Sequence, residues 1–158
     1  MTDAELWQQE RTWPSPPPFG HPARAGLRMD RTNPPEPRVL VIDDDDDLRT
    51  LVVRVVEQAG YAVDSASDGQ AGLERLAEQT YDVIVCDLRM PRMDGAAFYR
   101  EVERRVPAVA RRVVLMTGHL KAEEYMDFLR GVRVPVLNKP FTLDEFRSTL
   151  ARMVGPRR

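Results

Sequence analysis

Residues 39–60 of the chain are VLVIDDDDDLRTLVVRVVEQAG, and this stretch decides the fold. Its first four residues, Val39–Ile42, are a continuous apolar run rich in β-branched side chains, as expected of a strand that is buried on both faces. After five aspartates, apolar residues recur with the three- and four-residue spacing of an amphipathic helix, and Gly60 ends the pattern. The stretch therefore predicts a buried strand followed by an amphipathic helix.

The same alternation recurs four more times, each time as a short apolar run followed by a stretch with helical spacing. Five strand–helix units predict an α/β fold with a doubly wound, five-stranded parallel sheet. The chain has neither a Gly-x-Gly-x-x-Gly nor a P-loop fingerprint, which disfavours the nucleotide-binding branches of this class. The last helix begins with Thr142-x-x-Glu145, the signature of a capping box. The later predicted strands are 61–65, 82–87, 113–117 and 134–138, and the later predicted helices are 68–79, 95–106, 121–130 and 143–154.

Residues 1–37 differ from the rest of the chain in their proline content. Eight of the thirteen prolines precede Val39, and their spacing forbids long helices and central strands. We therefore expect a Pro-rich, disordered or extended tail at 1–37 and a single domain at 38–155. Trp7 and Trp13 lie in the tail and leave two interpretations open: a leader without a role of its own, or a short docking segment with aromatic anchors.

The overall composition is that of a globular protein, with 158 residues, 42% apolar residues, 30% charged residues and a net charge of −2. These values exclude a wholly disordered or collagen-like chain and give no argument for nucleic-acid binding. No apolar run approaches the roughly 20 residues of a membrane span, and the first residues lack the apolar region of a signal peptide. Cys86 is the single cysteine, so it forms no internal disulfide. We expect a soluble, cytoplasmic protein.

Polar side chains follow four of the five predicted strands. In open parallel sheets, ligands bind beyond the carboxyl ends of the strands, so residues delivered there are candidate site residues. An ammonium is present only at Lys121 and Lys139, since 21 of the 23 basic residues are Arg. This makes a lysine at the end of the fifth strand notable. The residues delivered to this edge are Asp43 and Asp44 after the first strand, Asp87 after the third, Thr117 after the fourth and Lys139 after the fifth.

The acidic residues of this set predict a divalent-cation site. Asp46 and Asp47 are explained by the start of the following helix, since aspartate is favoured at the N-cap and in the first turn. Asp43 and Asp44 directly follow a buried strand, so we expect them to be partly buried, close to Asp87 and mutually repulsive. A hard cation such as Mg²⁺ relieves that repulsion, whereas the alternative is a merely acidic rim.

An aspartate beside a bound Mg²⁺ can also act as a nucleophile and form an aspartyl phosphate, which makes Asp87 the candidate acceptor. Phosphoryl transfer needs mainly positioning and neutralisation of charge. The ammonium of Lys139 supplies a positive charge, and the hydroxyl of Thr117 supplies a donor to a phosphoryl oxygen. For Thr117 an ordinary β-branched residue that ends a strand remains the alternative.

The chain resembles the receiver domains of two-component response regulators, which take phosphoryl groups from histidine kinases. The matching pieces, in order along residues 38–154, are VLVIDDD at 39–45, VIVCDLRMPRMDG at 83–95, VLMTG at 114–118 and NKPFT at 138–142. This resemblance implies a flavodoxin-like (βα)5 receiver fold and makes Asp87 the phosphoryl acceptor. It also implies that Asp43, Asp44, Asp87 and the backbone carbonyl of Arg89 hold Mg²⁺, that Lys139 contacts the phosphoryl group, that Thr117 moves as a switch, and that the Lys139–Pro140 peptide bond is cis.

Two positions depart from the pattern of this family. Its switch aromatic residue, three positions before the lysine, is here Val136, which questions the usual coupling between Thr117 and the last strand. Gly118 stands where alanine is commoner. Arg89 and His119 occupy positions that influence the lifetime of the phosphoryl group in this family.

The resemblance implies phosphorelay signalling, with Mg²⁺-dependent acceptance of a phosphoryl group on Asp87 from a histidine kinase or phosphotransfer protein. The chain then catalyses only its own phosphorylation and dephosphorylation and is not otherwise an enzyme. The alternative is a receiver-like scaffold that binds a partner without turning over phosphate. An aspartate-nucleophile phosphatase is disfavoured, because such enzymes carry Asp-x-Asp where this chain has Asp87-Leu88-Arg89.

The expected output is a protein–protein contact, and both a free-standing regulator and the receiver segment of a hybrid kinase fit the sequence. The chain ends at Arg158, so we expect no DNA-binding domain. By resemblance, the contact surface to a downstream protein lies at about 119–154, and a homodimer is a further partner that stays open. One helix of this surface is crowded with apolar residues: Tyr125, Met126, Phe128 and Leu129. They could form part of the contact surface, or the helix could be an ordinary core helix with one or two exposed apolar residues.

Overall fold

The computed structural model describes residues 35–118 and 123–156. Most of the predicted tail, including Trp7 and Trp13, lies outside the described residues, as do His119 and Lys121. Within the described part, no helix has both the length and the apolar character that a membrane span requires.

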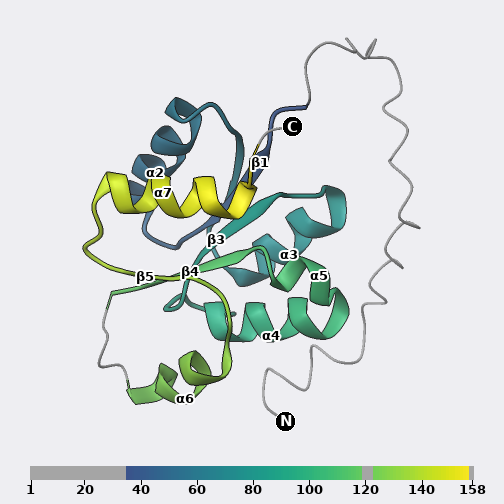
Figure 1. Ribbon diagram of the computed structural model, residues 1–158. Helices are drawn as coiled ribbons and strands as arrows, with labels where there is room; N and C mark the ends of the chain where they lie inside the picture. Colours follow the sequence, from purple (N-terminus) through teal and green to yellow (C-terminus); the bar gives the residue numbers. More distant parts are fainter. Residues whose placement is uncertain (1–34, 119–122, 157–158) are drawn as a thin grey trace. The chain divides into compact units, whose positions relative to one another are not determined.

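Five strands form one parallel sheet in the order β2-β1-β3-β4-β5 (Figure 1), which confirms the predicted doubly wound fold. The change of direction in this order lies between β1 and β3, where ligands are expected to bind. The strands are β1 Arg38–Ile42, β2 Ala62–Ala66, β3 Val83–Asp87, β4 Val113–Thr117 and β5 Val136–Asn138. The helices are α2 Asp46–Gln58, α3 Gly69–Glu78, α4 Gly95–Arg105, α5 Pro107–Ala110, α6 Glu123–Gly131 and α7 Leu143–Val154.

The helices cover both faces of the sheet. In Figure 1, α2 and α7 lie together on one face, and α3, α4 and α6 lie on the other. The three central strands are almost entirely apolar and buried, because side chains on both of their faces are covered by helices. On the α2–α7 face, the buried core consists of Val39, Val41, Val52, Val55, Val56, Val83, Val85, Val114, Met116, Leu137, Phe146 and Leu150.

The predicted capping box is confirmed at the start of α7. The backbone N–H of Glu145 donates to Thr142 Oγ1 at 3.1 Å, and the backbone N–H of Thr142 donates to the Glu145 carboxylate at 2.7 Å. Two donors at the helix start are thereby satisfied, which fixes where the chain leaves the sheet and enters α7.

Two proline residues shift the observed elements from the predicted ones. The last strand begins at Val136, not at residue 134, because Pro135 has no N–H to donate, although its carbonyl accepts from Leu115 at 3.0 Å. The helix predicted at 95–106 ends at Arg105. Pro107 then occupies the first turn of the short helix α5, which the sequence analysis did not predict.

Candidate functional site

The carboxyl edge of the sheet brings the predicted site residues together. Asp43 directly follows β1, Asp87 ends β3, Thr117 ends β4 and Lys139 directly follows β5. Ile42 pairs with Cys86, so the next residues of these two neighbouring strands, Asp43 and Asp87, leave the sheet side by side. The parallel register thus explains why side chains up to 96 positions apart in sequence meet at one place.

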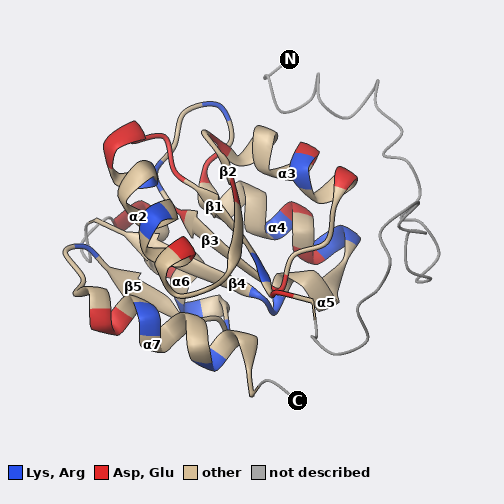
Figure 2. Ribbon diagram, turned by 90° about the horizontal axis from the view of Figure 1, so that it is seen from above, with Lys and Arg blue, Asp and Glu red and all other residues tan. Residues whose placement is uncertain are grey.

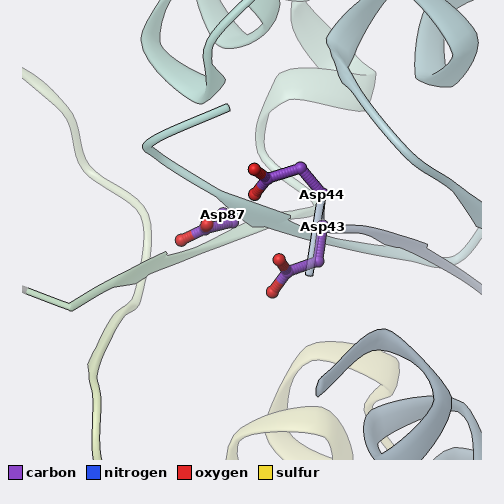
Figure 3. Close-up of side chains that lie close together, drawn as sticks. All are labelled: Asp43, Asp44 and Asp87. Atoms are coloured by element: carbon purple, nitrogen blue, oxygen red, sulfur yellow. The ribbon is translucent and has the colours of Figure 1, made fainter. Parts of the chain in front are cut away.

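Three carboxylates form a compact acidic cluster at this edge. Asp43, Asp44 and Asp87 each offer an oxygen atom, and these atoms lie within 4.8 Å of one another. Figure 3 shows the three carboxylates directed to the same side. Asp43 is fully buried and Asp87 is 6% exposed. The predicted clustering of the three residues is therefore what the structure shows.

The expectation that Asp44 is partly buried is wrong, because its side chain is exposed. The backbone N–H of Asp43 still donates to the Ala66 carbonyl at 3.1 Å, which extends the β1–β2 ladder by one residue. Asp43 is therefore held inside the sheet, whereas Asp44 is the first residue beyond it.

Lys139 lies between the two buried carboxylates. Its Nζ is 3.2 Å from Asp87 Oδ1 and 3.3 Å from Asp43 Oδ2, and its side chain is 22% exposed. The Lys139 backbone N–H donates to the Thr117 carbonyl at 2.7 Å, and the Lys139–Pro140 peptide bond is cis, as predicted. These contacts connect the ends of β4 and β5 with the acidic cluster, and Thr117 is buried at this junction.

The electrostatic environment of Asp87 favours its protonated form. The pKa of Asp87 is raised to about 6: burial is the largest cause, the carboxylates of Asp43 and Asp44 act in the same direction, and the ammonium of Lys139 opposes them. The neighbouring Cys86 thiol is fully buried, and its pKa is raised well above the usual value, chiefly by burial. Cys86 is consequently a core residue and not a nucleophile.

The acidic run also fixes the start of α2, which Figure 2 shows as a continuous red stretch leading into that helix. The Asp45 carboxylate accepts from the backbone N–H groups of Asp47 at 3.0 Å and Leu48 at 3.1 Å. Asp45 is therefore the N-cap, and Asp46 and Asp47 lie in the first helical turn, where acidic side chains are favoured, as the sequence predicts. The backbone N–H of Asp45 also donates to Asp43 Oδ1 at 3.0 Å, which orients that carboxylate.

Arg49 is a site residue that the sequence analysis missed. Its Nη1 donates to the backbone carbonyl of Asp43 at 2.7 Å, and its Nη2 binds the Asp46 carboxylate. The three-residue spacing from Asp46 to Arg49 is a signal for the helical pair, but nothing in the sequence indicates the contact with Asp43.

The loop between β3 and α4 closes tightly behind Asp87. The Gly95 N–H donates to the Leu88 carbonyl at 2.8 Å, and a Cβ at position 95 would lie 2.2 Å from the Asp87 carbonyl oxygen. Only glycine fits this close approach. Between these ends lies Arg89, whose guanidinium donates to Glu124 at 2.8 Å on the exposed side of the loop.

Helix α6 presents part of its crowded apolar sequence to the core and part to the surface. Tyr125 and Phe128 are buried, with Phe128 packed edge-to-face on Tyr99 at 5.7 Å between ring centroids, whereas Met126 is 36% exposed. The Tyr125 hydroxyl donates to the Asp94 carboxylate at 3.1 Å. Most of the crowding is thus explained by packing on α4.

The arrangement fits a small divalent cation. Two buried carboxylates and one exposed carboxylate supply hard oxygen ligands, and a single ammonium does not neutralise all three charges. An aspartate held beside a cation and an ammonium has the surroundings of an attacking nucleophile in phosphoryl transfer.

Comparisons with known proteins agree with this geometry. The family model described as "Response regulator receiver domain" matches residues 39–151. The chain is 33% identical over 117 residues to the transcriptional regulatory protein ZraR of Escherichia coli K12, covering 74% of this chain and 26% of that protein. It is equally identical over 117 residues to the DNA-binding transcriptional regulator NtrC of the same strain, covering 74% of this chain and 24% of that protein.

A solved structure shows the same fold over the same region. The chemotaxis protein CheY4 of Vibrio cholerae is 28% identical, with a TM-score of 0.67, and the match covers 75% of this chain and 99% of that one. The chain spans about a quarter of the length of the curated relatives that it matches. Residues 39–151, which the family model matches, contain all of the sheet except Arg38 and every residue of the acidic cluster. The chain belongs to the response regulator receiver domain family of two-component signalling systems.

Proposed function

We propose that Asp87 accepts a phosphoryl group from a phosphohistidine of a histidine kinase or phosphotransfer protein. One carboxylate oxygen of Asp87 forms the new bond to phosphorus, and the bond from phosphorus to the histidine nitrogen breaks, with its electron pair staying on nitrogen. The observation that carries this proposal is the position of Asp87 at the centre of the site, within reach of two other carboxylates and 3.2 Å from the Lys139 ammonium.

Asp43, Asp44, Asp87 and the backbone carbonyl of Arg89 would hold Mg²⁺. When bound, the cation supplies neutralisation of the charge that develops on the phosphoryl oxygens. Asp43 is well placed for this role, because the Asp45 N–H and the Arg49 guanidinium hold its side chain and its carbonyl in place. The exposed Asp44 carboxylate suits a ligand that acts through a water molecule.

Lys139 and Thr117 would bind the transferred group. The Lys139 ammonium pairs with Asp87 before transfer and can pair with a phosphoryl oxygen after it. Thr117 ends the neighbouring strand β4 and would donate its hydroxyl to another phosphoryl oxygen. Hydrolysis of the aspartyl phosphate at this site returns the resting state, so the chain turns over only its own phosphoryl group.

A protein donor would dock on the apolar groove beside the site. The groove has a volume of about 460 Å³ and lies between α2 and the start of α7. Its lining includes Leu51 and Leu143, which are 51% and 45% exposed, together with Lys139 itself. A donor that brings phosphorus to Asp87 must cover the surface around Lys139, and an apolar face on the donor would then bury these leucines.

The signal would leave through protein–protein contacts of α6, β5 and α7, the described part of the surface expected at 119–154. Met126 on α6 is exposed and available for such a contact.

A receiver-like scaffold without phosphate turnover is the second candidate, and Val136 is the observation that favours it. Val136 begins β5, half-buried and paired with Leu115, where the family resemblance expects an aromatic switch. Without that aromatic residue, partner binding independent of phosphorylation is a coherent function for the same fold.

The intact mass of the protein after incubation with acetyl phosphate and Mg²⁺ separates the two candidates. We expect one phosphoryl adduct on the parent, none without Mg²⁺ and none on Asp87→Asn. Asp127→Asn, on an exposed carboxylate of α6, is the matched control and should keep the adduct. A folded parent that takes no adduct from acetyl phosphate or from a histidine kinase would support the scaffold.

A further inference from the structure

Arg92, in the loop behind Asp87, is bound to a buried carboxylate on the far side of that loop. Asp68 is 3% exposed, and it accepts from Arg92 Nε at 2.9 Å and also from Arg92 Nη2. The other Asp68 oxygen accepts from the Ala71 N–H at 2.9 Å, which makes Asp68 the N-cap of α3. A buried aspartate thus connects the start of α3 to the β3–α4 loop.

A second contact holds the same part of the loop against α3. The Gly69 N–H donates to the Met93 carbonyl at 3.2 Å, and a Cβ on residue 69 would lie 2.8 Å from that oxygen. With the Gly95–Leu88 hydrogen bond, the loop is therefore fixed at its two ends and at its outer side. Arg89 lies in the part of the loop that these contacts hold.

The backbone of Arg92 has a conformation that needs such support. Its φ is 66°, and among non-glycine residues in the described part of the chain it alone has a positive φ. Residues other than glycine, asparagine and aspartate adopt this region at an energetic cost, which is tolerated where surrounding contacts offset it. The ion pair with Asp68 is the contact that the Arg92 side chain makes.

We propose that Arg92 is a positioning residue for the cation site: through Asp68 it fixes the β3–α4 loop in the conformation that presents the Arg89 carbonyl to the metal. This inference rests on the proposed Mg²⁺ site. It also predicts the direction in which the metal affinity changes when Arg92 is removed. Arg92 is a cation, so its charge alone weakens the binding of a metal ion, and removing it should strengthen binding. Positioning has the opposite consequence, since losing a partner that orients a ligand weakens metal binding.

The test is a calorimetric Mg²⁺ titration of the full chain at constant ionic strength, with three substitutions. Arg92→Asn removes the cation, while asparagine still tolerates the backbone conformation. Arg92→Lys keeps a cation that can reach Asp68. Asp68→Asn removes the charge but keeps an oxygen for the Ala71 N–H. Amide hydrogen exchange of residues 88–95, measured without Mg²⁺, gives a readout that does not depend on the metal.

We expect Arg92→Asn and Asp68→Asn each to weaken Mg²⁺ binding by about threefold to tenfold and to speed exchange in the loop. The double variant should be no weaker than either single one, because one contact is lost in all three. Arg92→Lys should stay within about twofold of the parent. Unchanged or stronger binding by Arg92→Asn, or additive losses in the double variant, would overturn this inference alone. A parent that binds no Mg²⁺ would overturn it together with the proposed function.

Discussion

The Lys139 ammonium lies 3.2 Å from Asp87 Oδ1 and 3.3 Å from Asp43 Oδ2, so one cation serves two buried carboxylates. One ammonium and two carboxylates leave a net negative charge in this site, where Asp43 is fully buried and Asp87 is nearly so. Burying these charges costs free energy, and other contacts must offset that cost if the site is to bind a cation strongly. The hydrogen bonds from the Asp45 N–H and the Arg49 guanidinium to Asp43 are two such contacts. Under the proposed function, Lys139 would weaken metal binding at rest and would stabilise the phosphoryl group after transfer.

Replacing Lys139 should separate those two effects. In Lys139→Met we expect Mg²⁺ affinity to rise by about twofold to fivefold, because a competing cation is lost. The rate of phosphorylation by acetyl phosphate should fall by about a hundredfold, because the charge on the transferred group is no longer neutralised. Calorimetry and the rate of adduct formation measure the two quantities.

Arg130→Met is the control for Lys139→Met. Arg130 is an exposed cation on α6, 3.7 Å from Asp127 and outside the site. It should change neither quantity by more than about twofold. Equal losses of metal binding and of phosphorylation in Lys139→Met would contradict the division of roles.

Asp87→Asn should make the metal-free protein more stable at pH 7. Burial, with the neighbouring carboxylates, raises the pKa of Asp87 to about 6, so keeping it ionised at pH 7 is unfavourable to folding. We expect the free energy of unfolding in urea to rise by about 1–2 kcal/mol, after the loss of the Lys139 pair is allowed for. The stabilisation of the parent by Mg²⁺ should shrink in the variant. A metal-free variant less stable than the parent would refute this.

The Asp68–Arg92 pair should give a measurable pH dependence. Burial alone raises the pKa of Asp68, but the Ala71 N–H and the Arg92 guanidinium together lower it below its usual value. An aspartate with a lowered pKa in the folded protein contributes stability above its unfolded pKa, near 4, and loses it as the pH falls through the folded pKa.

Asp68→Asn should accordingly be less stable than the parent by about 1–2 kcal/mol at pH 6–7. This difference in unfolding free energy should shrink towards zero below about pH 3. Urea denaturation across this range measures it, and the variant removes the contribution of the other carboxylates from the comparison. A difference that does not vary with pH would show that the carboxylate charge is not what stabilises the contact.

The sequence predicted the sheet and the residues at its edge because those features depend on short-range patterns. The apolar run Val39–Ile42 and its four counterparts define the strands, and parallel pairing then brings the residues that follow them together. Lys139 and Asp87 could be assigned to one site in this way without knowledge of any distance. The start of β5 and the extra helix α5 were missed, since both depend on how single prolines act within a local context.

The supporting contacts could not be predicted, because they join groups whose sequence separation carries no pattern. Arg49 reaches the carbonyl of Asp43, and Arg92 reaches Asp68 across 24 positions. In a chain with 21 arginines, nothing distinguishes these two from the others. The exposure of Asp44 was also mispredicted, because it depends on the β1–β2 ladder ending at Asp43, one residue before Asp44.

Two glycines close to the site should respond in opposite ways to alanine. In Gly95→Ala the new Cβ would lie 2.2 Å from the Asp87 carbonyl oxygen, so the loop must shift at a cost of about 1–3 kcal/mol. At Gly118 the nearest atom to a new Cβ is Lys139 Cδ at 4.0 Å, and the backbone is outside the left-handed region. Gly118→Ala should be neutral or stabilising by up to about 1 kcal/mol.

Urea denaturation and phosphorylation by acetyl phosphate test the glycine pair together. Gly95→Ala should lose both stability and phosphorylation, whereas Gly118→Ala should keep the phosphorylation rate of the parent. A large loss in Gly118→Ala would mean that alanine at this position obstructs the site, contrary to the space that surrounds it.

The apolar groove beside Lys139 should matter for a protein donor and not for a small one. Leu51 is 51% exposed on α2 and lines the groove, so Leu51→Glu places a charge where a docked protein would exclude water. We expect transfer from a histidine kinase that phosphorylates the parent to slow by at least about tenfold, while phosphorylation by acetyl phosphate stays within about twofold. Met126→Glu is the matched control, because Met126 is 36% exposed on α6 and is not part of the groove lining. Equal slowing by the two substitutions would place the donor elsewhere, and equal slowing with both donors would show that Leu51 acts on the site itself.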